Sequence, residues 1–107
     1  MLQVFSPIDG ALILEREPAG PEQVEQAVAD ARRGQERWGG LPLEERVEIL
    51  TRFVDAMVAR KDELAPELSL TMGRPSRFAP GELRGFEDRA RTMLRLAPEA
   101  LARIEAG

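Results

Sequence analysis

The sequence predicts a mostly helical fold that begins with a short β-hairpin. Apolar residues recur at intervals of three and four from residue 21 onward, which is typical of amphipathic helices. Proline and glycine stand at the ends of these stretches, where helices start and stop. Two short apolar runs flank a turn sequence near the N-terminus. We therefore expect a single segment over residues 1–107, with a hairpin at 2–17 and helices at 21–38, 43–60, 62–72 and 80–97.

The composition predicts a folded, soluble polypeptide. Of the 107 residues, 43% are hydrophobic and 32% are charged. The net charge is -4, from 19 acidic and 15 basic residues, which argues against a nucleic-acid partner. No apolar run approaches the ~20 residues that a membrane helix needs, so we expect no membrane partner. The N-terminus lacks a basic start and an apolar signal core, so we expect a cytoplasmic location.

Residues 2–17 have the order strand, turn, strand. Pro7 fixes φ, Asp9 favours a turn, and Gly10 accepts a positive φ. A two-stranded hairpin is marginal in water, so its apolar side chains need a covering surface. The apolar runs are Leu2, Val4 and Phe5 before the turn, and Ala11–Leu14 after it.

The first helix is expected to begin near Pro21, since proline is tolerated at the first helical position. Gly39 and Gly40 supply its end. We interpret Trp38 as a core residue rather than a binding aromatic, because it ends an apolar helical face. That face comprises Val24, Ala27, Val28, Ala31 and Trp38.

The second helix starts at Pro42 or Leu43 and carries the strongest helical pattern. Acidic residues near its start and basic residues near its end suit the helix dipole. Its broad apolar stripe comprises Val47, Leu50, Phe53, Val54, Met57 and Val58.

Prolines complicate the last two helices. Pro66 would remove a hydrogen bond inside the third helix, so we expect the helix to start near Pro66 or to kink there. Gly73 ends that helix, and Ser76 is a candidate cap for the next. Pro98 ends the last helix or starts a further turn. The third helix places Leu64, Leu68 and Met72 on one face, and the fourth buries Leu83, Phe86, Ala90, Met93, Leu94 and Ala97.

Few residues offer catalytic chemistry. The chain has no Cys, His or Tyr, so it lacks a thiolate nucleophile, the commonest general base and the usual metal ligands. A serine or threonine would need Lys61 or a carboxylate as its base, and no motif supports that pairing. We therefore assign no catalytic, cofactor-binding or metal-binding residue. The hydroxyls are Ser6, Ser69, Ser76, Thr51, Thr71 and Thr92, for which capping and surface roles are expected.

Charged clusters and glycines have structural explanations. Adjacent carboxylates such as Glu44 and Glu45, Asp62 and Glu63, or Glu87 and Asp88 are expected on solvated helix faces. The glycines match neither dinucleotide nor phosphate-loop patterns. A locally basic stretch is interleaved with acidic residues, so ion pairs at i,i+3 and i,i+4 explain it better than an RNA surface. It contains Arg74, Arg77, Arg84, Arg89, Arg91 and Arg95.

Five short motifs follow one another along the chain. They are Ser6-Pro7-Ile8-Asp9-Gly10 before a strand, an alanine-rich helix leading to Trp38, Pro42 to Arg46, Asp62-Glu63-Leu64-Ala65, and Thr71-Met72-Gly73-Arg74-Pro75. In this order they resemble the opening of NAD(P)-dependent aldehyde dehydrogenases. In the last motif, Thr71 and Arg74 replace the family's Glu and Lys. The resemblance covers about residues 3–97.

The resemblance implies the opening segment of the α/β aldehyde dehydrogenase fold, within the cofactor-binding domain. Full-length members oxidise aldehydes to carboxylic acids with NAD or NADP, a Cys nucleophile, a Glu base and an oxyanion-site Asn. None of these positions falls on a residue here. The first hypothesis is a non-catalytic N-terminal scaffold, a fragment of the enzyme whose partner is the remainder of the chain or a homo-oligomer. The alternative is a stand-alone helical interaction module without enzymatic activity.

Overall fold

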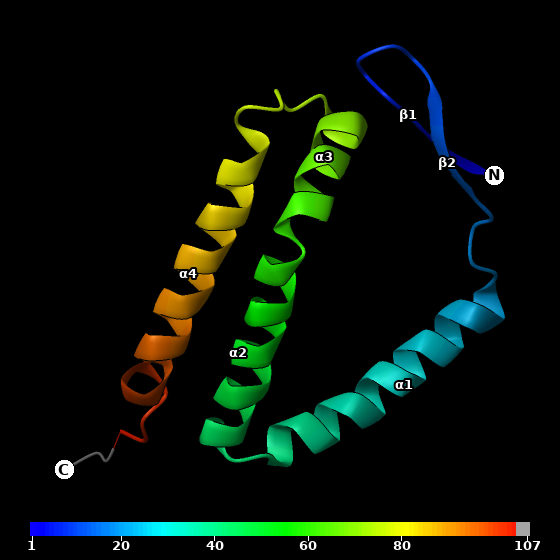
Figure 1. The fold of residues 1–107 in the computed structure, drawn as a ribbon. Coiled ribbons are helices and arrows are strands. Elements are labelled where there is room, and N and C mark those ends of the chain that lie inside the picture. Colours follow the sequence, from blue (N-terminus) through cyan, green and yellow to red (C-terminus); the bar gives the residue numbers. More distant parts are fainter. Residues whose placement is uncertain (105–107) are drawn as a thin grey trace.

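The computed structural model describes residues 1–104 and confirms the predicted fold class. A two-stranded antiparallel hairpin is followed by four helices (Figure 1). The strands are β1 (Leu2–Phe5) and β2 (Leu12–Arg16). The helices are α1 (Pro21–Gly40), α2 (Leu43–Ala59), α3 (Lys61–Met72) and α4 (Ala79–Ala100). No helical end lies more than three residues from its expected position. None of the described helices is both long enough and apolar enough to cross a membrane.

The hairpin turn is closed by backbone and side-chain hydrogen bonds. The Ser6 N–H donates to the Ala11 carbonyl at 2.8 Å, and the Gly10 N–H donates to the Ser6 carbonyl at 2.9 Å. The Asp9 carboxylate accepts from the Ala11 N–H at 3.0 Å. Gly10 has φ 74°, the left-handed conformation that the turn sequence predicts. Strand pairing shifts register between Val4 and Phe5, which leaves one extra residue on β2.

Helices α2, α3 and α4 pack into one bundle, in which α2 and α3 follow one another along α4 (Figure 1). Its main apolar cluster is small and joins α3 to α4. Ala65, Ala79 and Leu83 are buried there, and Leu64 and Leu68 pack against them. Val54 of α2 is 2% exposed and is the largest fully buried side chain among the described residues.

Helix α1 lies apart from this bundle, with α2 standing between α1 and α4 in Figure 1. No residue of α1 is buried, and Trp38 is only half-buried. The expected core position of Trp38 is therefore not reached within residues 1–104. The connection to α2 is short, because only Leu41 and Pro42 separate the two helices.

Prolines disturb the helices less than expected. Helix α3 begins at Lys61, one residue from the expected 62, and continues through Pro66, so the alternative start near Pro66 is wrong. The N–H that Pro66 lacks would have reached only the carbonyl of Asp62, in the first turn of the helix. Helix α4 likewise runs past Pro98 to Ala100. Gly73 does end α3, with φ 71°, as the sequence predicts.

Candidate functional site

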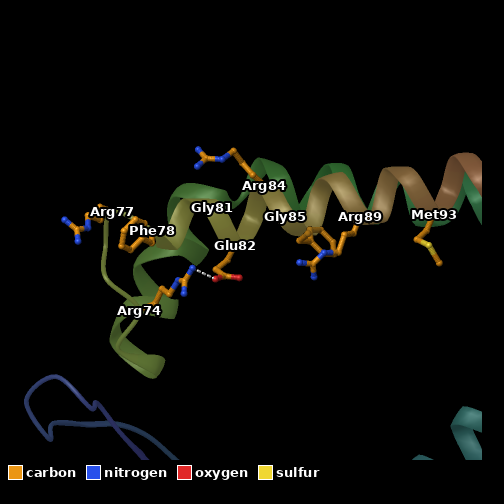
Figure 2. Close-up of a pocket in the computed structure, with 11 residues that line it drawn as sticks. Arg74, Arg77, Phe78, Gly81, Glu82, Arg84, Gly85, Arg89 and Met93 are labelled. Atoms are coloured by element: carbon orange, nitrogen blue, oxygen red, sulfur yellow. Dashed lines mark ion pairs between the residues drawn. The ribbon is translucent and has the colours of Figure 1, made fainter.

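A concave surface of about 790 Å³ follows one face of α4 and the loop before it (Figure 2). Gly81 and Gly85 form its floor, because neither residue places a side chain there. Phe78 stands at one end and Met93 at the other. Four arginines border it, namely Arg74, Arg77, Arg84 and Arg89.

The four guanidinium groups do not meet at one point. Arg74 pairs with Glu82 at 2.7 Å, and Arg77 stacks on the Phe78 ring at 4.7 Å from its centroid. Figure 2 shows Arg84 and Arg74 pointing to opposite sides of α4. Since a compact anion needs convergent donors, this surface does not form one anion-binding centre. Of the basic stretch as a whole, Arg91 makes a predicted helical ion pair within residues 1–104, with Glu87 at i,i+4.

Two backbone N–H groups at the start of α4 are already used within the chain. The Ala79 N–H donates to the Pro75 carbonyl at 3.2 Å, and the Gly81 N–H donates to the Phe78 carbonyl at 2.9 Å. Pro80 has no N–H. Phe78 occupies the N-cap, so the expected capping role of Ser76 is wrong. A dinucleotide pyrophosphate uses free N–H groups at a helix start, and the Ala79 and Gly81 N–H groups are not free for one.

Three of the six hydroxyl groups form hydrogen bonds with the backbone. Thr51 and Thr71 donate to the carbonyls four residues earlier, each at 2.8 Å. The Ser6 hydroxyl accepts from the Ile8 N–H at 3.3 Å. Ser69 is 7% exposed, and its hydroxyl has no hydrogen-bond partner within residues 1–104. No basic side chain activates any of these four hydroxyls in that part of the chain.

Lys61 lies in a different environment from the hydroxyls. It lines a hollow of about 250 Å³ with Asp62, Arg84 and Glu87, and no serine or threonine shares this lining. The serine–lysine pairing considered from the sequence is therefore not assembled there. Within residues 1–104, no group of three or more Asp, Glu, His or Cys side chains is arranged to hold a metal.

The charged pairs are mostly on exposed faces. Arg60 donates to Glu63 at 2.6 and 2.9 Å, and this hydrogen bond holds the pKa of the Glu63 carboxyl below its ordinary value of 4.5. Arg91 joins α4 to α2 through Asp55 at 2.7 Å and also binds Glu87 at 2.9 Å. These hydrogen bonds raise the pKa of Arg91, with the Asp55 bond the larger cause. The contacts of Arg60 and those of Arg91 therefore have structural roles.

An apolar groove of about 340 Å³ runs between α2 and α4. Phe53 and Phe86 meet in it edge to face, with ring centroids 6.1 Å apart. The expected burial of the two helical stripes is incomplete, because Phe53 is 52% and Met93 is 69% exposed. Sequence periodicity found the stripes but not the pairing of the helices that makes a groove. The lining residues are Leu50, Phe53, Val54, Phe86, Ala90, Met93, Leu94 and Ala97.

Most of the motif residues found in the sequence lie at the beginnings, ends and turns of elements. Ser6–Gly10 form the hairpin turn, Trp38 lies in the last turn of α1, and Pro42 is the N-cap of α2. Asp62 lies in the first turn of α3, and Gly73 ends it. A family model described as "Aldehyde dehydrogenase family" matches residues 1–106. The chain therefore belongs to the aldehyde dehydrogenase family.

Proposed function

We propose that these 107 residues are an N-terminal scaffold segment of an aldehyde dehydrogenase and are not catalytic by themselves. In this proposal the segment lies in the cofactor-binding domain and supports the family reaction, the NAD(P)-dependent oxidation of an aldehyde to a carboxylic acid. Its partner is the remainder of the enzyme chain. Its cytoplasmic location stays a prediction from the sequence.

The observation that supports this proposal is the excess of exposed surface. A compact monomer of 11.9 kDa has an accessible surface of about 6,000 Å². This chain has 8951 Å². Its radius of gyration is 18.9 Å, whereas about 13 Å is usual for a compact domain of this length. The segment is thus shaped like a part of a larger body.

Part of the excess surface consists of apolar side chains on the hairpin and on α1. Leu12 is 48% and Leu14 is 42% exposed in the hairpin, as expected for a fragment without its covering surface. Val24 and Val28 on α1 are about half exposed. Contiguous apolar surfaces of this kind mark interaction sites. The remainder of an aldehyde dehydrogenase would supply the cover that the hairpin and α1 lack here.

The described side chains also support a structural role. Thr51 and Thr71 bind backbone carbonyls, Arg91 joins two helices, and two N–H groups at the start of α4 are already paired. The resemblance implies that the Cys nucleophile, Glu base and oxyanion-site Asn act from positions other than these. When bound to the full-length enzyme, NAD(P) would accept the hydride removed in the oxidation.

Complementation tests this proposal. The 107-residue chain is mixed during refolding with a family member that lacks the matching N-terminal segment, and NADH formation from an aldehyde is followed at 340 nm. We expect no activity from either part and activity from the mixture. A Leu83→Asp segment, which places a charge in the α3–α4 cluster, should not restore activity. Measurable NADH from the 107-residue chain alone would contradict the proposal, and so would an inactive complex of the two folded parts.

A further inference from the structure

The concave surface beside α4, here called the Gly81–Gly85 groove, carries positive charge that its own chain does not neutralise. We propose that this groove holds a helix from the remainder of the enzyme chain, and that this helix carries carboxylates on both of its flanks. The inference rests on the proposed function, because the remainder of the enzyme is the partner. It adds which surface of the segment is covered and which chemistry covers it.

Three of the four arginines at the groove form no ion pair within residues 1–104. The three are Arg77, Arg84 and Arg89. Arg74 pairs with Glu82, and Asp88 forms no ion pair with Arg84 although it lies one helical turn away. Four arginines and one glutamate give the lining a charge of +3, on a chain whose net charge is -4. Carboxylates of a partner would complement this local charge.

The fold of the chain does not require glycine at the floor of the groove. An added Cβ on Gly85 would meet no atom outside its own stretch of helix backbone within 4 Å. An added Cβ on Gly81 would meet only the Arg84 guanidinium, at 3.7 Å. Glycine is less favourable than alanine within a helix, and neither residue has a positive φ. The missing side chains instead let the backbone of another segment approach α4 closely.

The size of the groove suits a helix of three to four turns. From Gly81 to Met93 the groove follows α4 for about 18 Å, at 1.5 Å per residue. A helix of this length and about 10 Å in width occupies about 1,400 Å³. The hollow of about 790 Å³ therefore accommodates about half of its thickness. Figure 2 shows Arg84 on one side of α4 and Arg89 on the other, so the carboxylates are required on both flanks.

The chemistry of the groove favours an acidic polypeptide over a nucleic acid. Phe78 is 48% and Met93 is 69% exposed at its two ends, and both offer apolar contacts to a helix. The guanidinium groups diverge instead of following one line of phosphates. The net charge of -4 also repels a polyanion at longer range.

The position of the groove favours the remainder of the enzyme as the source of this helix. The loop before α4 joins the groove to the hairpin, because an added Cβ on Gly73 would lie 3.0 Å from Pro7. The next residue, Arg74, places its guanidinium 6.0 Å from the centroid of the Phe78 ring. A body that covers the exposed strands of the hairpin therefore lies beside the Phe78 end of the groove.

Titration of the free 107-residue chain tests the chemistry of the groove. The probe is a synthetic helix of about 14 residues, with glutamates on both sides of an alanine stripe, and its Kd is measured by calorimetry at low ionic strength. A peptide with glutamine in place of glutamate and a single-stranded DNA of about 14 nucleotides are the comparisons. The double variant Arg84→Gln/Arg89→Gln removes two charges, and Gly85→Leu fills the floor. The matched control Arg95→Gln removes a charge from an exposed position on α4 outside the groove.

We expect the acidic peptide to bind the native chain and the control equally, and the double variant about tenfold more weakly, since each exposed ion pair contributes up to about fivefold. Gly85→Leu should also weaken binding, although its helical circular dichroism and melting temperature should not fall below those of the native chain. Equal binding of the acidic and glutamine peptides would overturn the proposal. Tighter binding of the DNA, or a double variant that binds like the control, would also overturn it.

Cross-linking in the refolded mixture of the complementation test identifies the source of the helix. Lys61 is the only lysine of the chain, so Arg84→Lys adds one amine that a carbodiimide can join to a contacting carboxylate. We expect a cross-link from position 84 to an Asp or Glu of the remainder, and none from the control Arg95→Lys. A complex that forms without the cross-link from position 84 would overturn the assignment to the remainder. Failure of the two parts to associate would contradict the proposed function instead, and the peptide titration would still decide the chemistry of the groove.

Discussion

Replacing Leu83 by alanine should destabilise the chain strongly, because Leu83 belongs to its main apolar cluster. The side chain is 8% exposed and lies with Ala65 and Ala79 at the α3–α4 contact. Leu→Ala removes three carbon atoms, and about 0.8 kcal/mol per buried methylene gives about 2.4 kcal/mol. An added cavity term raises the range to about 2–4 kcal/mol. Because a folded domain has only about 5–15 kcal/mol in total, this change is large.

Urea unfolding followed by circular dichroism at 222 nm measures this loss. Met93→Ala is the matched control, since Met93 is 69% exposed on the same helix and should change the free energy of unfolding by less than about 0.5 kcal/mol. At a Tm shift of about 4–8 °C per kcal/mol, Leu83→Ala should melt at least about 8 °C lower. Equal effects of the two substitutions would refute the assignment of the core to the α3–α4 contact.

Three further substitutions test local features. Gly73→Ala should lower the free energy of unfolding by about 1–2 kcal/mol, because Gly73 has φ 71° and an added Cβ would lie 3.0 Å from Pro7 Cγ. Gly85→Ala should raise it by about 0.5–1 kcal/mol in the same melt, since Gly85 is helical and an added Cβ would meet no atom outside its own stretch of helix backbone within 4 Å. The pKa of Glu63 is lowered by Arg60, so its contribution to stability is present above pH 4.5 and is lost as the pH falls through the folded pKa. Glu63→Gln should remove that contribution. The urea midpoint of the native chain should therefore fall more between pH 6 and pH 3 than the urea midpoint of the variant.

The sequence predicted the elements because local chemistry sets where they begin and end. Pro21 starts α1, and Gly73 ends α3 with the positive φ that glycine accepts. The predictions that failed were those in which tertiary context outweighs local preference. Pro66 is tolerated inside α3, and Phe78 rather than Ser76 forms the N-cap of α4. A cap depends on where the chain turns, which a single residue type does not determine.

Periodicity located the apolar faces but could not say what covers them. Leu83 and Met93 belong to the same predicted face of α4, yet one is 8% and the other 69% exposed. Leu83 faces α3, whereas Met93 lies beside the open groove toward the C-terminal end of α4. The apolar pattern of a helix therefore indicates which face favours burial, and only the packing of the other elements shows which part of that face is buried. The pairing of Phe53 with Phe86 has no signal in the sequence for the same reason.

A contact between two distant motifs explains why turn and stop residues identified the family when no catalytic residue could. Pro7 lies in the first motif and Gly73 in the last, 66 positions apart, yet a Cβ on Gly73 would meet the Pro7 ring at 3.0 Å and 3.7 Å. Proline fixes the turn that presents this ring, and glycine both ends α3 and leaves room for it. The two motifs together specify one tertiary contact, which seats the hairpin against the end of α3. A larger residue at Gly73 would move the hairpin and with it the exposed apolar strands. In this chain the two motifs therefore carry information about the fold rather than about chemistry.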